Sequence, residues 1–147
     1  MARDRDFTKL GANINELEIA WKDRLADAKS LITAGRNATA IALGIYSLEI
    51  LLKTLICKKL DLSQLPTAFE IHEPDQLLVL AGLNRQMNQS RKKPIKQNWD
   101  AIVNASKKIN DLRYSPDNKW TKEQVSELLD QLEDPINGVI PWHLMRR

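Results

Sequence analysis

The sequence predicts an all-α fold, an up-and-down bundle of four to five helices, and three observations support this prediction. Apolar residues recur at steps of three and four over most of the chain, which is the repeat of an amphipathic helix. No segment alternates apolar and polar residues over more than a few positions, as a half-buried strand would. The composition, with 43% apolar and 28% charged residues, is that of an ordinary globular chain.

The length of the chain favours one domain over residues 1–147. A chain of 147 residues can bury roughly two-thirds of its unfolded surface, which is enough for a substantial core. We expect that core to span about residues 13–134. Residues 135–147 are then a C-terminal tail, and its segment "VIPWHLMRR" is apolar enough to pack before it ends in basic residues.

The two longest helices are expected at residues 13–34 and 37–60. The first has one apolar stripe, and Gly35 supplies the left-handed residue that commonly ends a helix. The second is the most apolar part of the chain. Five of its apolar residues follow a three-and-four repeat, and others cover a second face: Ile41, Ile45, Leu48, Leu52 and Leu55, then Tyr46, Ile50, Cys57 and Leu60. It is therefore either the central helix of a bundle or a helix whose second face meets another subunit.

Three further helices complete the predicted bundle. The third begins near Pro74, because proline is well tolerated at the first helical position, and its apolar stripe reaches Met87 before "NQSRKKP" breaks it. The fourth begins near Ile95, and continuing its repeat by one turn places Arg113 on the apolar face, along the edge of the core. The fifth begins at "TKEQ", a capping-box pattern, and Pro135 must kink or end it.

Several classes of protein and site are disfavoured by the sequence. The uncharged run that begins at Asn37 ends before Glu49, far short of the roughly 20 residues that cross a bilayer, so we expect no membrane partner. The charged N-terminus does not resemble a secretory signal, and Cys57 is the single cysteine, so a cytoplasmic location is expected. The two histidines lie in no metal-binding motif, and glycine-rich nucleotide loops are missing, so no cofactor is predicted.

Positive charge is concentrated in one part of the sequence. The net charge is +3, but residues 85–113 contain eight Lys or Arg and only two Asp. One interpretation is a solvated helical surface. The other is a phosphate-binding region centred on "RKKPIK", which includes Arg91, Lys92, Lys93 and Lys96.

Other residues have both a structural and a functional interpretation. Glu49 and Lys53 stand four apart on a helix that should be largely covered, so they form either a structural ion pair or part of a polar pocket. Cys57 is expected to be an inert buried thiol. Trp21 and Trp99 lie on helix stripes and should be core, whereas Trp120 and Trp142 flank loops and could also stack on a base.

Three segments together resemble the HEPN family (higher eukaryotes and prokaryotes nucleotide-binding). They are "NATAIALGIYSLEILLKTLICKKL", then "IHEPDQLLVLAGL", then "INDLRYSP", and they span about residues 37–116. The resemblance rests on an apolar helix with a leucine and lysine pattern, a His before the next helix, here His72, and a turn that contains Arg113 and Tyr114. It implies a helical bundle that is frequently dimeric, and either ribonuclease activity or a binding role without catalysis. HEPN-like proteins are often encoded beside a nucleotidyltransferase partner.

The ribonuclease members of that family carry an Arg followed after four to six residues by a His, and this chain lacks the motif. The positions that would have to hold the Arg are Leu65, Pro66 and Thr67 for His72, and Ile136, Asn137 and Gly138 for His143. Cleavage of a phosphodiester needs both proton transfer and stabilisation of charge on the phosphate, so a His without its Arg is insufficient. We therefore assign no catalytic residue. The chain also departs from the family pattern at Ser115 and in its broken last helix.

The sequence thus favours a HEPN-like helical protein, without catalysis, that binds a nucleotide, an RNA phosphate or a protein such as a nucleotidyltransferase. The candidate binding residues are Lys53, His72, Arg91, Lys92, Lys93, Lys96, Arg113 and Tyr114. One alternative is a metal-independent ribonuclease or toxin component of a toxin–antitoxin pair, with a non-standard site at His72 and Arg113. Another is a structural homodimer formed through the helix at residues 37–60.

Overall fold

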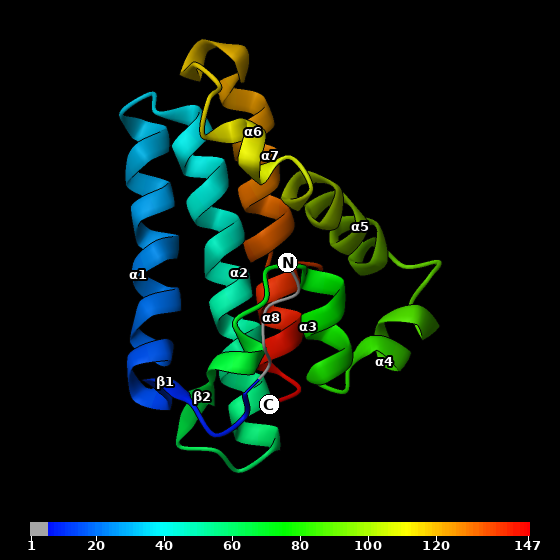
Figure 1. Ribbon diagram of the computed structural model, residues 1–147. Helices are drawn as coiled ribbons and strands as arrows, with labels where there is room; N and C mark the ends of the chain where they lie inside the picture. Colours follow the sequence, from blue (N-terminus) through cyan, green and yellow to red (C-terminus); the bar gives the residue numbers. More distant parts are fainter. Residues whose placement is uncertain (1–5) are drawn as a thin grey trace.

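A long helix, α2 (Asn37–Lys59), lies at the centre of the fold, and most of the other helices pack around it (Figure 1). The computed structural model describes residues 6–147. In chain order the remaining elements are β1 (Leu10–Asn13), α1 (Ile14–Thr33), β2 (Gln64–Pro66), the 3-10 turn η1 (Thr67–Phe69), α3 (Pro74–Leu80), α4 (Asn84–Gln89), α5 (Pro94–Ser106), α6 (Ile109–Leu112), the 3-10 turn η2 (Asp117–Lys119), α7 (Lys122–Glu133) and α8 (Val139–Leu144). The chain is mostly helical, as predicted.

α1 and α2 form an antiparallel pair along one side of the protein (Figure 1). α1 starts after Asn13, whose side chain accepts a hydrogen bond from the Glu16 backbone N–H at 2.9 Å and so satisfies one free donor of the first turn. It ends at Thr33, and Gly35, two residues further on, has the left-handed φ of 74° that commonly follows a helix. One buried polar contact joins the pair, because the Ser47 hydroxyl of α2 donates to the Trp21 carbonyl of α1 at 2.9 Å. The predicted limits of both helices are confirmed to within one residue at each end.

α2 is almost completely surrounded by the chain's own side chains. Between residues 40 and 57 its incompletely buried positions are Ala42, Leu43, Tyr46 and Ile50, which form one stripe. By length and mean hydropathy alone α2 could cross a membrane, with a value of 1.8 over its most apolar window, but 78% of that window is buried inside the protein. Central helices of globular proteins meet the same criteria, so this finding is only weak evidence for a membrane span.

The prediction of four to five helices is wrong in number, because the described residues form eight α-helices. The expected third helix is divided into α3 and α4 at Gly82, which has φ 72° and so ends α3 with the backbone turn that glycine adopts most readily. The expected fourth helix is divided into α5 and α6. At that break the Ser106 hydroxyl donates to the Val103 carbonyl at 2.6 Å, a local bond of the kind that competes with helical hydrogen bonding.

The break after α5 also corrects the placement of Arg113. The repeat that places this residue on the apolar face assumes an unbroken helix. α6 instead restarts at Ile109 with a different orientation, and Arg113, which caps its C-terminal end, is exposed. Arg113 therefore does not lie along the core edge.

A two-stranded antiparallel sheet was not predicted. β1 pairs with β2, with Leu10 opposite Pro66 and Asn13 opposite Gln64. Strands of four and three residues are too short for an alternating pattern to stand out in the sequence. The sheet joins the start of α1 to the segment that leads to α3.

The C-terminal part of the chain belongs to the main core. α7 begins with the predicted capping box, in which Thr121 and Gln124 each satisfy a backbone N–H of the other. α7 ends at Glu133, just before Pro135, and α8 follows as a separate helix. Val139, Ile140 and Trp142 of α8 are buried in the same cluster as the side chains of α2, so the core continues beyond residue 134.

The N-terminus of α2 is capped by a residue far away in the sequence. Arg36, at the N-cap position, makes no capping hydrogen bond with its side chain. The carboxylate of Asp117 in η2 accepts instead from the Ala38 backbone N–H at 3.0 Å, and Asn37 Nδ2 donates to the Trp120 carbonyl at 2.7 Å. The loop before α7 is thereby attached to the start of the central helix.

Candidate functional site

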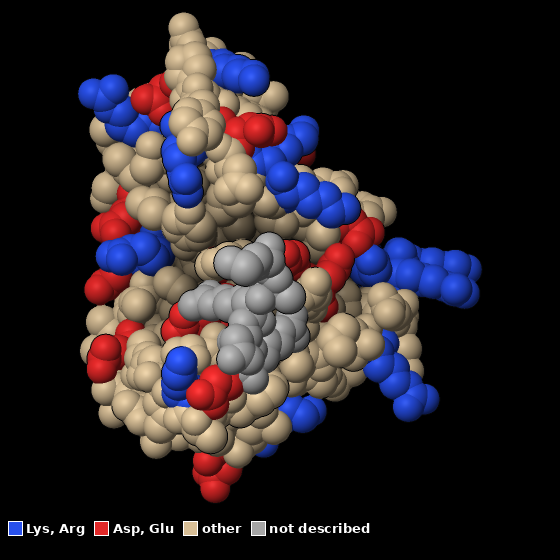
Figure 2. Space-filling model, viewed as in Figure 1, with Lys and Arg blue, Asp and Glu red and all other residues tan. Residues whose placement is uncertain are grey.

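A cleft of about 690 Å³ opens beside the incompletely buried stripe of α2. α1 and α2 form one wall, and the α5–α6 junction and the segment before α3 form the others. The residues that line it are Arg24, Ile45, Tyr46, Glu49, Ile50, His72, Glu73, Ser106, Lys107, Ile109, Asn110 and Arg113. In Figure 2 a hollow is visible near the centre of the face shown, with Lys and Arg side chains along its upper and left edges.

The floor of the cleft is largely apolar. Tyr46 and Ile50 lie one turn apart on the incompletely buried stripe of α2, and Ile45, which also lines the cleft, is more deeply buried. Ile109 of α6 faces them across the cleft. Such a floor offers an apolar body or a ring a surface from which water can be displaced.

At the deep edge of the cleft lies a buried carboxylate. The Glu49 side chain is 7% exposed, and the Lys53 side chain, one turn further along α2, is 10% exposed. Lys53 Nζ lies 3.5 Å from Glu49 Oε1, which confirms the predicted ion pair. Two charges in such a place are tolerated because each compensates the other, whereas either alone would be strongly unfavourable.

The same carboxylate also holds His72, which the sequence does not reveal. His72 Nδ1 lies 2.5 Å from Glu49 Oε1, and since a carboxylate only accepts, the imidazole donates from Nδ1. The His72 side chain is nevertheless 75% exposed. Its second ring nitrogen, Nε2, is therefore free to act as an acceptor when the ring is neutral. Just before α3, the His72 backbone N–H also donates to Glu73 Oε2 at 3.2 Å.

Positive charge lies on the rim of the cleft. Arg24 of α1 forms an ion pair with Asp27, with Nε of the guanidinium 3.0 Å from Oδ2 of the carboxylate. Lys107 and Arg113 have no ion-pair partner among residues 6–147, and both are exposed. Because Lys53 already offsets Glu49, these two side chains are the charges of the cleft most available to an anion.

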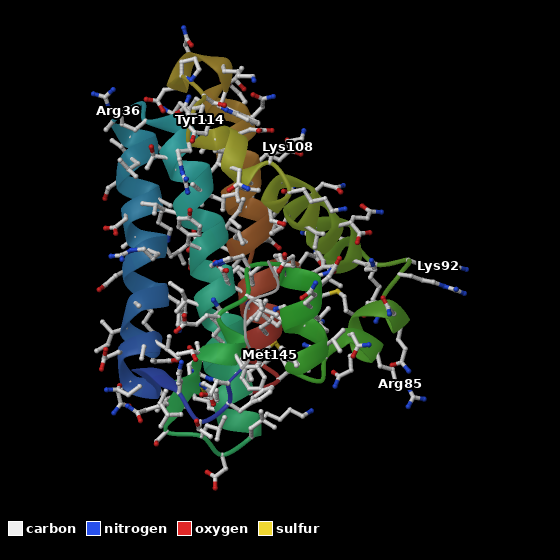
Figure 3. The ribbon with its side chains drawn as sticks, viewed as in Figure 1. Arg36, Arg85, Lys92, Lys108, Tyr114 and Met145 are labelled. Carbon is white, nitrogen blue, oxygen red and sulfur yellow. The ribbon has the colours of Figure 1, made fainter. Side chains whose placement is uncertain are left out.

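The structure divides the predicted binding residues into two groups. His72 and Arg113 line the cleft, with Lys53 behind Glu49. Arg91, Lys92 and Lys93 lie at the opposite end of α5, where Figure 3 shows Lys92 pointing away from the body of the protein. Lys96 is paired with Asp100 at 2.5 Å. Tyr114, next to Arg113, is 83% exposed and does not line the cleft. The basic run and Arg113 therefore do not form one surface.

Some residues of the cleft were not among the predicted site residues. Arg24, Tyr46 and Lys107 come from three different parts of the chain, and each follows the ordinary pattern of its own segment. Glu49 carried the one usable signal, because a carboxylate in the middle of an apolar helix needs partners. The pattern indicated Lys53 as a partner but not His72, which is brought there by the fold.

The remaining chemically capable side chains lie elsewhere. Trp142 is buried beneath Arg146, whose guanidinium is 3.9 Å from the ring centroid, so it is not an open stacking surface. Trp120 is half-buried in a smaller hollow of about 250 Å³ between α5 and α7, which Lys108 also lines. Burial raises the pKa of the Cys57 thiol, as expected for an inert cysteine. Among residues 6–147, no His, Cys, Asp and Glu side chains gather as a metal site would require.

Comparison of the chain with protein-family models, with curated proteins and with solved structures finds no match. The functional proposal for this protein rests on the geometry and charges of the cleft.

Proposed function

We propose that the cleft binds a phosphate-bearing ligand, a nucleotide or a nucleotide unit of RNA. The observation that carries this proposal is the combination, in one cleft of about 690 Å³, of an apolar floor, two unpaired cations and a buried hydrogen-bonding carboxylate. Pockets for nucleotide-sized ligands have volumes of roughly 300–1,000 Å³ and combine apolar walls with a few fixed polar groups. The volume and the lining of this cleft both agree with that description.

Each part of the cleft has a role in this proposal. Arg113 and Lys107 bind the phosphate, Arg113 being able to donate two parallel hydrogen bonds to its oxygens. Tyr46 and Ile50 contact the flat base or the sugar. Glu49 fixes the ring of His72, so that Nε2 is held at the cleft surface as an acceptor for a ligand hydroxyl.

The structure provides a matched pair of variants for testing this proposal. Lys107 lines the cleft, whereas its neighbour Lys108 lines the other hollow. We expect Arg113→Gln and Lys107→Gln each to weaken binding of a labelled five-nucleotide RNA by about tenfold or more, the effect of losing a charge-assisted hydrogen bond. Lys108→Gln should leave the affinity nearly unchanged. Fluorescence anisotropy at low salt measures the RNA affinity of the unsubstituted protein and of the three variants.

Two results would contradict the proposal. If Lys107→Gln and Lys108→Gln weaken binding equally, the affinity reflects the net charge of the protein and not the cleft. If the affinity does not depend on salt, phosphate contact is not its source; two contacts to a single strand predict a slope of log K against log salt of about −1.4.

The Glu49–His72 contact favours a second candidate, metal-independent cleavage of RNA in the same cleft. In this reaction His72 Nε2 accepts the proton of a ribose 2′-hydroxyl, whose oxygen attacks the adjacent phosphorus. The bond from phosphorus to the 5′-oxygen breaks, giving a 2′,3′-cyclic phosphate, and the departing 5′-oxygen takes a proton from water to become a 5′-hydroxyl. Arg113 offsets charge on the phosphate oxygens. This arrangement replaces the missing Arg–His sequence motif with residues from separate segments.

Incubating labelled RNA with the protein and EDTA distinguishes cleavage from binding alone. If the candidate is right, RNA is cut, His72→Ala abolishes cutting and Glu49→Gln reduces it. RNA with 2′-deoxy substitutions is bound but not cut. Intact RNA under these conditions, with binding retained, would leave the cleft as a binding site only.

This proposal also includes three parts: a relationship to the HEPN family, a homodimeric state, and a nucleotidyltransferase or antitoxin partner. Their support is the order of the resembling segments, which lie on α2, on α3, and on α6 with the turn that follows it. A homodimer formed through α2 would have to use its incompletely buried stripe at Ala42, Leu43, Tyr46 and Ile50, which borders the cleft. Light scattering that gives 16.8 kDa would exclude the dimer, and twice that mass would support it.

A further inference from the structure

α4 and the turn after it form a second positive surface, separate from the cleft. Between Asp75 and Asp100 the chain contains no acidic residue. Four cations in this interval are exposed and have no ion-pair partner within the described part of the chain: Arg85, Arg91, Lys92 and Lys93. We call these four residues the basic patch. Their charges are not offset locally, so they are available to an external anion.

Arg85 of the basic patch lies on α4, which is anchored in the core, and the other three residues lie in the turn between α4 and α5. α4 is held from beneath by Leu83 and Met87, which are buried in the main core. Its opposite side carries hydrogen-bonding side chains, and five residues line a shallow hollow of about 680 Å³: Asn84, Arg85, Asn88, Gln89 and Arg91. Figure 3 shows Arg85 and Lys92 projecting outward at the edge of the molecule.

The composition of this surface indicates the kind of partner. Protein-binding surfaces depend on aromatic or apolar anchors, and single-stranded nucleic acid is held by aromatic stacking. Within residues 84–98 the large apolar side chains, Met87 and Ile95, are both buried. What remains are cations and amides, which contact phosphates and base edges.

The basic patch and the cleft lie at the two ends of α5. The patch adjoins the start of this helix at Pro94, and Lys107 of the cleft follows its end. Thirteen helical residues span about 20 Å, which is more than one small ligand covers. One small ligand therefore cannot contact both surfaces.

We propose that the basic patch binds double-stranded DNA, with α4 at the major groove and Arg91, Lys92 and Lys93 on the flanking phosphates. An α-helix with its side chains is about 10–12 Å across, which matches the major groove of B-form DNA at about 12 Å. The corresponding groove of an RNA duplex is too narrow to admit it. Asn88 and Gln89 are of the residue types that hydrogen-bond to adenine in that groove.

Fluorescence anisotropy with a labelled 16-base-pair DNA duplex, over a series of salt concentrations, tests the proposal. The three phosphate contacts of Arg91, Lys92 and Lys93 predict a slope of log K against log salt of about −2.7, and Arg91→Gln should reduce its magnitude by about 1. Lys122→Gln removes the same charge from an exposed position on α7 and should leave the slope unchanged. All these side chains are exposed, so the variants remove no core packing.

Other outcomes would overturn the proposal. Equal affinity for a single strand, or for an RNA duplex of the same sequence, would exclude the major groove, and displacement by polyglutamate at equal charge would indicate an acidic protein partner. A loss of slope in Lys122→Gln equal to that in Arg91→Gln would indicate a general charge effect. Loss of duplex binding in Arg113→Gln would show that the duplex binds in the cleft and not at the basic patch. Unchanged duplex binding in that variant supports two separate sites.

Discussion

Glu49 connects the core of the protein to its cleft. It accepts a hydrogen bond from His72 and pairs with Lys53, and it is buried while His72 is exposed. Removing its charge leaves the Lys53 ammonium buried without compensation. Breaking a buried ion pair in this way typically lowers the free energy of unfolding by about 3–5 kcal/mol. Substitution by glutamine keeps the size and an acceptor oxygen, so Glu49→Gln tests the role of the charge with less damage to folding than alanine would cause.

His143 should make the stability of the fold depend on pH. Burial lowers the pKa of this histidine to about 4, with the charge of Arg146 acting in the same direction and the hydrogen bond to the Val139 carbonyl opposing it. In the unfolded chain a histidine has a pKa of about 6.5, so between pH 6.5 and 4 the unfolded state binds a proton that the folded state does not. The free energy of unfolding therefore falls as the pH decreases through this window.

Between pH 7.5 and 5 we expect this histidine to reduce the free energy of unfolding by about 2 kcal/mol, measured by urea unfolding. His143→Phe keeps a ring between Trp99 and Trp142 and should remove most of this pH dependence. The chain has two histidines, and His72→Gln serves as the control that retains it. An unchanged pH dependence in His143→Phe would show that another group is responsible.

At the scale of elements, the attachment of η2 to the start of α2 should contribute measurably to stability. We expect Asp117→Ala to lower the free energy of unfolding by about 1 kcal/mol, because the Ala38 N–H loses its acceptor. Asp117→Asn keeps an acceptor and should cost only part of that, because it removes just the negative charge, which lies near the helix N-terminus and 3.7 Å from Arg36 Nη1. Urea unfolding at neutral pH measures both variants.

Asn118→Ala is the matched control, since Asn118 is exposed beside Asp117 and makes no capping contact. It should change the free energy of unfolding by less than about 0.5 kcal/mol. Equal effects of Asn118→Ala and Asp117→Ala would mean that the loop, and not the cap, determines the loss.

The elements that could be predicted from the sequence are those whose signals are local. α1 and α2 have long apolar repeats and a glycine between them, and α7 has its capping box. The division of α3 from α4 also had a local signal in Gly82, but the apolar stripe continues on both sides of it and suggests one helix. The break at Ser106 has only a weak local signal in the sequence, and so does the short sheet. Both depend on contacts between distant segments.

The cleft could be predicted only in part, for the same physical reason. His72 and Arg113 are candidates on sequence grounds, but Arg24, Lys107 and the contact between His72 and Glu49 arise from the packing of segments that are distant in sequence. A periodic pattern describes which side of a helix is buried. It does not describe which other helix arrives there, and so the pattern could not predict the separation of Arg91 from Arg113 either.

At the scale of the whole molecule, one core includes side chains from α1 to α8. We expect a protein truncated after Asp134 to lose cooperative unfolding. It would lack the buried side chains of Val139, Ile140 and Trp142, and burial of each contributes about 1.5–3 kcal/mol. That sum is comparable to the whole stability of a typical domain, about 5–15 kcal/mol.

Thermal unfolding followed by circular dichroism measures this loss. A chain truncated after Met145 keeps α8 and is the control; it should still unfold in a single transition. A sharp transition in the shorter chain, at an unchanged midpoint, would contradict the assignment of α8 to the core.

The position of α2 has a consequence for how this protein can change. One side of the helix fills the interior, and the other supplies the bottom of the cleft through Tyr46, Glu49 and Ile50. Mutations at these positions that change the shape of the proposed binding surface will also alter the melting temperature, so selection cannot act on the two properties separately. Lys107 and Arg113 are exposed and free of that constraint, so substitutions there change the charge of the cleft without changing the core.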